Sequence, residues 1–350
     1  RSRYYQRQLS GGLSKSRKPY ILQVFKRPSL GVRKGVVVDL EELTLTLSQI
    51  VSEVKSINRS ALENVFVNIG SNQATARFSR GFIAVSRADS EISRDDIERS
   101  IQASAAIRLP SNRSIIHIIP REFFVDAVAV KDPLGLFGTR LEVDSLIIDA
   151  FAPIVKNLSN CLKAAGIADF QTIFSPLAGA RAVLSKTQSD LGVVLVDIGG
   201  GKIDLSIYVY GALSYSSSIP IGARHISNDI AVGLRVSLDS AEKIKIFLSK
   251  NLDMNNPISI GKKKTPQINL NELDLPENLT EVSLKTLVDG IVAPRLEEIF
   301  KLIFEEIEKS GFGQQIPSGL VISGGGALTI GMLETGKRVV GLPIRIGFPE

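Results

Sequence analysis

Hydrophobic and polar positions repeat along the chain with two periods, and these periods separate helices from strands. Apolar residues at helical spacing predict helices over residues 40–57, 154–165, 240–249, 295–309 and 328–340. Ser93, followed by early acids, is predicted to cap and open one more helix. Alternating or continuously apolar runs predict strands over residues 20–25, 65–69, 73–85, 115–119, 141–148, 193–196, 203–208 and 319–323. Helices and strands mixed in this order indicate an α/β chain.

The most informative segment, residues 191–208, is a buried strand that ends in an acid and three glycines before a second strand begins. Gly199, Gly200 and Gly201 can adopt positive φ, so that backbone N–H groups approach an anion with no side chain in the way. Asp197, at the strand end, would reach a Mg²⁺ ion that bridges phosphates, usually through water, because Mg²⁺ gives up its hydration shell reluctantly. The pattern predicts a phosphate-binding hairpin. An ordinary tight hairpin with an acid at its mouth is the alternative.

A second glycine turn follows the strand over residues 319–323. Gly324, Gly325 and Gly326 stand between this strand and a helical pattern, and backbone donors at the start of a helix favour an anion or a nucleotide. The chain contains no G-x-x-x-x-G-K-[ST] sequence, which excludes a Walker-type ATPase. A Rossmann dinucleotide site is excluded as well, because Thr329 replaces the last glycine and no strand–helix–strand continuation is expected.

Between the two glycine turns, the helix over residues 240–249 carries Glu242, Lys245 and Ser249 at i, i+3 and i+7, on one shared face. By itself such a face is most often solvated. In this order, however, the hairpin, the helix and the glycine turn resemble the nucleotide-binding elements of the actin-like ATPases. Proteins of that superfamily have a two-lobed, ribonuclease H-like fold and hold ATP between the lobes. The resemblance implies that the hairpin binds the β- and γ-phosphates, that the helix contacts the ribose and adenine, and that the glycine turn supports the adenosine.

Within that superfamily the chain resembles the FtsA family, from about residue 20 to its last residue. Residues 28–41 are similar to the start of the family's inserted α+β domain of the SHS2 type, and residues 116–124 and 131–136 to its end. The resemblance implies a cell-division scaffold that binds ATP between its lobes, polymerises into filaments and links FtsZ filaments to the cytoplasmic membrane. Such a protein is cytoplasmic, peripheral on the inner face of the membrane at the division site, and at most a weak ATPase.

The resemblance also implies a division into domains. The expected parts are a basic, disordered arm (residues 1–19), an incomplete first lobe (20–30 and 121–190), the inserted SHS2-type domain (31–120), the second lobe (191–240 and 314–350) and a mostly helical subdomain of that lobe (241–313). In FtsA relatives this subdomain receives the C-terminal peptide of FtsZ, and Arg295 and Glu298 match the family positions implicated in that contact.

Charge and composition narrow the function classes. The first 34 residues hold ten lysines or arginines and no acid, whereas the rest of the chain holds 32 basic and 36 acidic residues, a balance of −4. The folded body therefore gives no reason to expect a nucleic-acid partner, and the basic arm is either a solvated tail or a contact to anionic lipid. The single Cys161 argues against a disulfide framework and favours a reducing cytoplasm. No apolar run approaches the roughly 18 residues of a membrane span, and no signal peptide is visible.

Two features of the family are missing from their expected places. No Asp-Ile-Gly-Thr hairpin precedes residues 20–25, and residues 344–350 correspond to a point before the family's last helices and its amphipathic membrane anchor. We therefore expect an FtsA-like chain cut at both ends, in which binding of ATP and Mg²⁺ is weak or lost and the helix that contacts the membrane is absent. A diverged homologue that lost nucleotide binding is the alternative.

Substitutions inside the motifs bear on the chemistry. Lys202 follows the glycines where a hydroxyl residue is usual, and it would either add positive charge to the phosphate site or point into solvent. Ser175, in the crossover over residues 172–184, stands where hydrolytic relatives place a glutamate that orients water, so slow or absent hydrolysis is expected. His117 and His225 have no metal-like spacing and are expected to be structural. Two alternatives stay open: a type IV pilus adaptor of the PilM kind, and an enzyme such as a sugar kinase or polyphosphatase.

Overall fold

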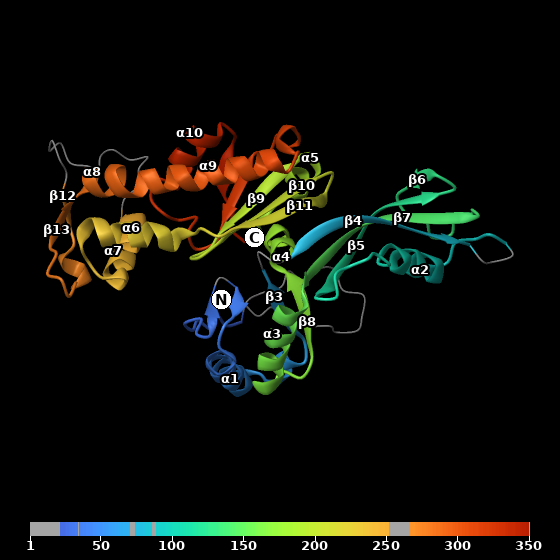
Figure 1. Cartoon of the computed structure of the whole chain (residues 1–350), viewed down its shortest axis with the longest axis horizontal. Helices are drawn as coiled ribbons and strands as arrows, with labels where there is room; N and C mark the ends of the chain where they lie inside the picture. The colour runs from blue at the N-terminus through green and yellow to red at the C-terminus, as the bar shows by residue number, and fades with distance from the viewer. Residues whose placement is uncertain (1–21, 34, 71–73, 86–88, 252–266, 350) are drawn as a thin grey trace. The chain divides into compact units, whose positions relative to one another are not determined.

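The computed structural model describes residues 22–33, 35–70, 74–85, 89–251 and 267–349 (Figure 1). The chain divides into two compact units, unit 1 with residues 1–175 and unit 2 with residues 176–350. The basic arm predicted for residues 1–19 lies outside the described residues. How the two units divide further into lobes and subdomains stays a prediction.

The first part of unit 1 packs two helices with two strands. Its elements are α1 (Leu40–Ile57), β3 (Val65–Ile69), α3 (Ala152–Ala164) and β8 (Phe170–Phe174). β3 and β8 pair in parallel, and their core consists of Val51, Val65, Leu162 and Ile167. α1 begins and ends where its apolar stripe predicts, with Asp39 accepting from the N–H of Glu42 as its cap. The strand predicted over residues 20–25 is wrong for residues 22–25, since no described strand pairs with them.

The second part of unit 1 is an antiparallel sheet with one helix packed on it. In spatial order the strands are β4 (Thr75–Ala84), β7 (Arg140–Phe151), β5 (Arg113–Val125) and β6 (Val128–Val130), and the helix is α2 (Arg94–Ser104). Ser93 caps α2 as predicted, within a capping box completed by Asp96. α2 approaches β4 so closely that a Cβ added at Gly81 would lie 2.3 Å from the backbone nitrogen of Ser104. β5 runs through residue 120, where the inserted domain was predicted to end, and the bounds of that domain stay a prediction.

Unit 2 is built on a five-stranded sheet. In spatial order its strands are β11 (Ala212–Ile219), β10 (Ile203–Val209), β9 (Val193–Ile198), β14 (Leu320–Ser323) and β15 (Ile344–Ile346). β9, β14 and β15 run parallel to one another, whereas β10 pairs antiparallel with both of its neighbours, β9 and β11. α10 (Met332–Val340) connects β14 to β15, so a strand–helix–strand unit does follow the second glycine turn. The contrary expectation was wrong because β15 has only three residues, too few to show a periodic pattern; Thr329 still departs from the Rossmann fingerprint.

Helices pack on this sheet and continue into a mostly helical layer. The layer contains α6 (Ala223–Leu234), α7 (Leu238–Asn251), α8 (Leu284–Leu287), the π-helical turn η4 (Val288–Val292), α9 (Ala293–Lys309) and the hairpin of β12 (Gln267–Asn269) and β13 (Glu281–Ser283). One core joins sheet and helices, and the predicted apolar stripe of α9 lies in it: Leu296, Ile299, Phe300, Ile303 and Ile307 are all buried.

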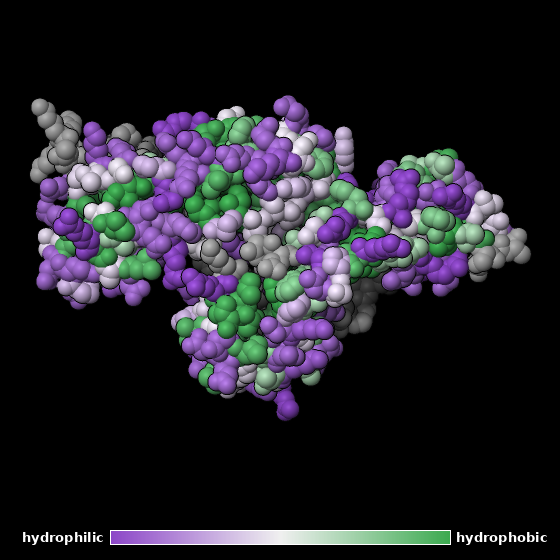
Figure 2. Space-filling view, in the orientation of Figure 1, coloured by the Kyte–Doolittle hydropathy of each residue, from purple (hydrophilic) through white to green (hydrophobic). Residues whose placement is uncertain are grey.

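Short elements complete both units. They are β1 (Val32–Arg33), β2 (Val36–Val37), η1 (Arg59–Leu62), α4 (Ser175–Val183), α5 (Lys186–Leu191), η3 (Asn271–Leu273) and η5 (Gly313–Gln315). Across the described ranges, no helix combines the length and the hydrophobicity that crossing a bilayer requires. In keeping with this, hydrophilic residues interrupt the hydrophobic patches on the face in view in Figure 2.

Candidate functional site

The predicted phosphate-binding hairpin is formed by β9 and β10, which pair antiparallel. The N–H of Gly199 donates to the carbonyl of Lys202 at 3.0 Å and closes the turn, and none of the three glycines has the positive φ that was expected. A Cβ added at Gly200 would meet no atom within 4 Å. The N–H groups of Gly200 and Gly201 donate to no group among the described residues. The chain's own packing therefore does not require glycine at Gly200, and the space in front of it is open to a ligand.

The second glycine turn lies directly beside the hairpin. β9 and β14 are parallel neighbours with Asp197 opposite Ser323, so both strands end at the same edge of the sheet. Gly324 has a φ of +86°, and a Cβ added there would lie 2.2 Å from Oδ1 of Asp197. The N–H of Gly326 donates to the carbonyl of Ile198 at 2.9 Å. The pairing of β9 with β14 thus brings together the two glycine turns that the sequence predicted separately.

α6, a helix that the sequence analysis did not single out, is bonded to the hairpin. The N–H groups of Ala223 and Arg224 donate to the carbonyls of Gly199 and Gly200 at 2.9 and 2.8 Å. A Cβ added at Gly222, the N-cap of α6, would lie 2.5 Å from the carbonyl oxygen of Gly199. The helix can therefore approach the hairpin only because its cap is glycine. A glycine between strand β11 and a helix is the local signal that could have indicated this contact.

α7 joins the same network through a buried lysine. The ammonium of Lys245 donates to the carbonyl of Ala223 at 3.2 Å and to the hydroxyl of Ser227 at 2.9 Å. It also donates to the carboxylate of Glu242 at 2.7 Å, to which Ser227 donates as well. Partial burial opposes ionisation of Glu242, but the hydrogen bonds from Lys245 and Ser227 outweigh it and hold the pKa of this carboxyl below its usual value. Lys245 is only 7% exposed and is packed on α6, whereas the side chain of Glu242 on the same face of α7 is 44% exposed.

Ser249 and Lys202, the remaining side chains of the predicted nucleotide set, also have partners within unit 2. The hydroxyl of Ser249 donates to the carbonyl of Lys245 at 2.8 Å and accepts from the N–H of Ile330, just after the second glycine turn, at 3.2 Å. The ammonium of Lys202 lies 2.6 Å from the carboxylate of Asp204. Lys202 therefore does not point into solvent, and Asp204 neutralises its charge.

Arg295 and Glu298, the residues predicted to contact a partner, form an ion-pair cluster with Asp229 of α6. Nε and Nη2 of Arg295 donate to the two carboxylate oxygens of Asp229 at 2.5 and 2.9 Å, and Nη1 donates to Glu298. Hydrogen bonding to Asp229 raises the pKa of Arg295. The side chains of Arg295 and Glu298 are 25% and 51% exposed, so the cluster is open to solvent on one side. Asp229 lies 66 residues from Arg295, and no local sequence signal could have found it.

Both histidines bond to the backbone. Nε2 of His117 accepts from the N–H of Phe174 at 2.9 Å, and Nδ1 of His225 lies 3.2 Å from the backbone nitrogen of Gly222. Within the part of the chain that the structure describes, no group of three or more His, Cys, Asp and Glu side chains could hold a metal ion.

Family models match both units. The model described as "Cell division protein FtsA" matches residues 194–350, and the model described as "SHS2 domain inserted in FTSA" matches residues 72–149. The second match covers α2 and the four-stranded antiparallel sheet almost completely.

Curated relatives align with nearly the whole chain. The cell division protein FtsA of Pseudomonas aeruginosa is 31% identical over 334 residues, which make up 94% of this chain and 77% of that protein. The FtsA of Neisseria meningitidis is 30% identical over 98% of this chain and 81% of its own length. The FtsA of Bacillus subtilis is 29% identical over 94% of this chain and 73% of its own length.

Solved structures share the fold at low sequence identity. The PilM–PilN type IV pilus biogenesis complex matches with a TM-score of 0.55 at 15% identity, covering 91% of this chain and 78% of that chain. MreB5 of Spiroplasma citri bound to ADP matches with a TM-score of 0.50 at 16% identity, covering 91% and 73%. These matches confirm the predicted α/β actin-like fold. The FtsA relatives, at about twice that identity, favour the FtsA interpretation over the PilM alternative. The chain belongs to the FtsA family of cell division proteins.

Proposed function

We propose that this chain is a division scaffold that binds MgATP with low affinity at the hairpin of unit 2 and recruits FtsZ by holding its C-terminal peptide at α9. One observation carries the proposal: Asp197, the hairpin glycines and Gly324 meet at one edge of the sheet, where α6 is hydrogen-bonded to the hairpin and α7 is hydrogen-bonded to α6. Self-association into filaments, and attachment to the inner face of the membrane at the septum, belong to the same proposal and rest on membership of the family.

The residues at the hairpin fit a phosphate group and a hydrated Mg²⁺ ion. Gly200 and Gly201 offer backbone donors beside open space, as anion-binding turns do. Asp197 is exposed at the end of β9 and supplies a carboxylate, the ligand class that Mg²⁺ prefers. Glu242, whose side chain is 44% exposed and whose pKa is lowered, can accept hydrogen bonds from sugar hydroxyls. A protein of the same fold, MreB5 of Spiroplasma citri, has been solved with ADP bound. When bound, Mg²⁺ would neutralise charge on the phosphates.

Hydrolysis is expected to be slow. Ser175 is the first residue of α4, and the resemblance to hydrolytic relatives predicts a water-orienting glutamate at its position. A serine there lacks the carboxylate, and orientation of water supplies a large part of phosphoryl-transfer catalysis. Replacing Ser175 by Glu should therefore raise phosphate release from MgATP. Unchanged release with nucleotide still bound would show that another group positions the water.

The nucleotide proposal is tested with fluorescent mant-ATP and the variant Gly200→Ala. A Cβ at this position meets no atom of the chain and φ is not positive, so stability should be unchanged. The methyl group would nevertheless occupy the space that the proposal gives to phosphate, and the affinity should fall about tenfold, a loss of about 1.4 kcal/mol. Asp197→Ala should remove the dependence of binding on Mg²⁺. Equal affinities for the wild type and Gly200→Ala would refute the phosphate assignment.

The recruitment proposal is tested with a labelled C-terminal FtsZ peptide and fluorescence anisotropy. An affinity in the micromolar range, about −8 kcal/mol, is expected for a transient contact of this kind. Arg295→Glu should weaken it at least tenfold, while Lys301→Glu, on an exposed part of α9 outside the cluster, serves as the matched charge control. No saturable binding at hundreds of micromolar peptide would reject the FtsZ contact.

A further inference from the structure

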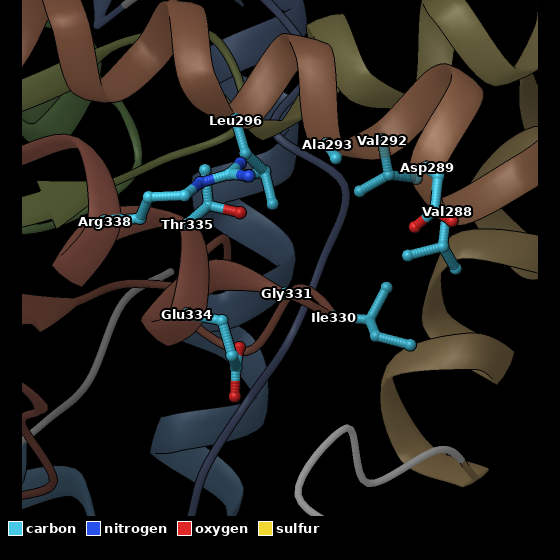
Figure 3. Close-up of a pocket in the computed structure, with 10 residues that line it drawn as sticks. All are labelled: Val288, Asp289, Val292, Ala293, Leu296, Ile330, Gly331, Glu334, Thr335 and Arg338. Carbon is cyan, nitrogen blue, oxygen red and sulfur yellow. The ribbon is translucent and has the colours of Figure 1, made fainter. Parts of the chain in front are cut away.

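A pocket of about 220 Å³ lies beside α9 (Figure 3). It is lined by residues of η4, α9 and α10 and of the turn that precedes α10. Ala293 and Leu296 contribute from α9, and at about 100° per residue they lie roughly half a turn around the helix from Arg295 and Glu298. The pocket is therefore separate from the face assigned to FtsZ.

The floor of the pocket is apolar. Val292 and Leu296 are fully buried beneath it, and Val288 and Ile330 are each 5% exposed. Gly331 contributes no side chain and has a φ of +78°; a Cβ there would lie 3.6 Å from the nearest methyl group of Leu296. η4 on one side is a π-helical turn, a feature that occurs frequently at functional sites.

The rim of the pocket carries two carboxylates that no described residue pairs. Asp289 projects from η4 and Glu334 from α10, on different sides of the pocket (Figure 3). Both are exposed, and neither makes a salt bridge or hydrogen bond with any described residue. The cation at the rim, Arg338, is already paired with Glu297 at 2.5 Å. An apolar floor under two unpaired carboxylates is complementary to an apolar group that carries a positive charge.

The volume of the pocket limits the size of that group. A dry cavity of about 150 Å³ accommodates benzene, whereas sites for drug-sized ligands and cofactors begin at about 300 Å³. A pocket of about 220 Å³ fits one ring with a short chain and is too small for a nucleotide. We propose that this pocket binds a compact organic cation, an apolar body of about one ring that bears a single ammonium group. The apolar body lies on Val292, Leu296 and Ile330, and the ammonium lies between Asp289 and Glu334.

The test uses the full chain with ¹³C-labelled isoleucine methyl groups, because Ile330 lines the pocket and reports on its occupant. Two probes of matched size are titrated: the phenethylammonium cation and the 3-phenylpropionate anion. The cation should shift the Ile330 methyl resonance saturably, with a dissociation constant of about 1 mM, as suits a fragment of this size. The anion should bind at least about tenfold more weakly.

Three variants decide the result. The double variant Asp289→Asn with Glu334→Gln should weaken binding of the cation about fivefold or more, since each change removes one charge at the rim. Ala293→Leu fills the pocket from α9 and should abolish the shift, while Glu305→Gln, exposed elsewhere on α9, should leave it unchanged. Unperturbed methyl resonances of the other core isoleucines verify folding of each variant. Equal binding of the two probes, undiminished binding by the double variant, or no response of Ile330 at about 20 mM cation would each overturn the proposal.

Discussion

Two clusters in this protein use the same chemistry, an aspartate held by arginine, in different surroundings. In unit 1, Asp149 of β7 is fully buried and bonds to Arg113 and, at 3.1 Å, to Nε of Arg77. In unit 2, Asp229 of α6 bonds to Arg295 through both carboxylate oxygens, but its side chain is 29% exposed. Removing one member of a buried cluster leaves an uncompensated charge in the interior, whereas an exposed pair can exchange its partner with water or a ligand.

Exposure, rather than residue type, therefore separates a structural cluster from one that can take part in recognition. A third cluster, formed by Lys245, Glu242 and Ser227, lies between the two extremes: the lysine is buried but the glutamate is 44% exposed. The effects of substitution on stability should therefore decrease in the order Asp149, Lys245, Arg295. Any other order would contradict this comparison.

Asp149→Ala is expected to have the largest effect. The change leaves Arg113, whose side chain is 16% exposed, without its carboxylate and should destabilise unit 1 by about 3–5 kcal/mol. Faster hydrogen exchange at the amides of β5 and β7, with unit 2 unaffected, would measure the loss. Asp144→Ala is the matched control, because Asp144 lies on the same strand and pairs with Arg80 but is 36% exposed; it should change exchange little. Similar effects of the two variants would show that burial does not decide the outcome.

Lys245→Met is expected to have an intermediate effect. Methionine keeps the apolar stem but leaves the carbonyl of Ala223 and the hydroxyl of Ser227 without their donor, at a cost of about 1–3 kcal/mol. Thermal unfolding of unit 2 measures this cost, and Lys243→Met, exposed on the same helix, is the control. Because Lys245 links α7 to α6, affinity for mant-ATP should fall in the same variant. A stable variant with reduced affinity would mean that Lys245 contacts nucleotide directly.

Arg295→Ala should cost about 1 kcal/mol or less in stability, because the pairs with Asp229 and Glu298 are partly exposed. Its effect on binding of the FtsZ peptide should be several times larger in free energy. Thermal unfolding measures the loss of stability, and peptide anisotropy on the same sample measures the loss of binding free energy. A large loss of stability would place Arg295 with Asp149 among the structural clusters and remove the reason to assign it to recruitment.

The smallest effect should come from pH, through Glu277. Its carboxylate accepts from the N–H of Ser237 and the hydroxyl of Ser240, both at 2.7 Å, and these bonds at the start of α7 lower its pKa to about 2 from an ordinary value of 4.5. Since the folded pKa lies below the unfolded one, the stabilisation is complete above about pH 4.5 and is lost as the pH falls toward 2. The difference in melting temperature between wild type and Glu277→Gln should therefore shrink below pH 4.5. A difference in melting temperature that stays constant with pH would show that these hydrogen bonds do not contribute to stability. Glu272→Gln is the control, because Glu272 is exposed.

Much of the fold followed from the sequence, because the responsible signals are local. The apolar stripe of α1 predicted both of its ends, and the stripe of α9 predicted its buried face. Turn chemistry located the hairpin at residues 199–201, and the capping serine Ser93 located the start of α2. Periodicity and capping depend on residues within one or two turns of one another, so they can be recognised without knowing where the rest of the chain lies.

Which residues come into contact depends on the packing of elements that are distant in sequence. Pairing of β9 with β14 places Gly324 against Asp197, and packing of α6 brings Ser227 to Lys245 and Asp229 to Arg295. None of these contacts leaves a local pattern, because the partners are far apart in sequence and only the register of the sheet and the packing of the helices bring them together. Local sequence signals were enough to predict most of the elements, the chemistry that each carries and the resemblance to FtsA. Burial, which separates a structural ion pair from an accessible one, exists only after the chain has folded.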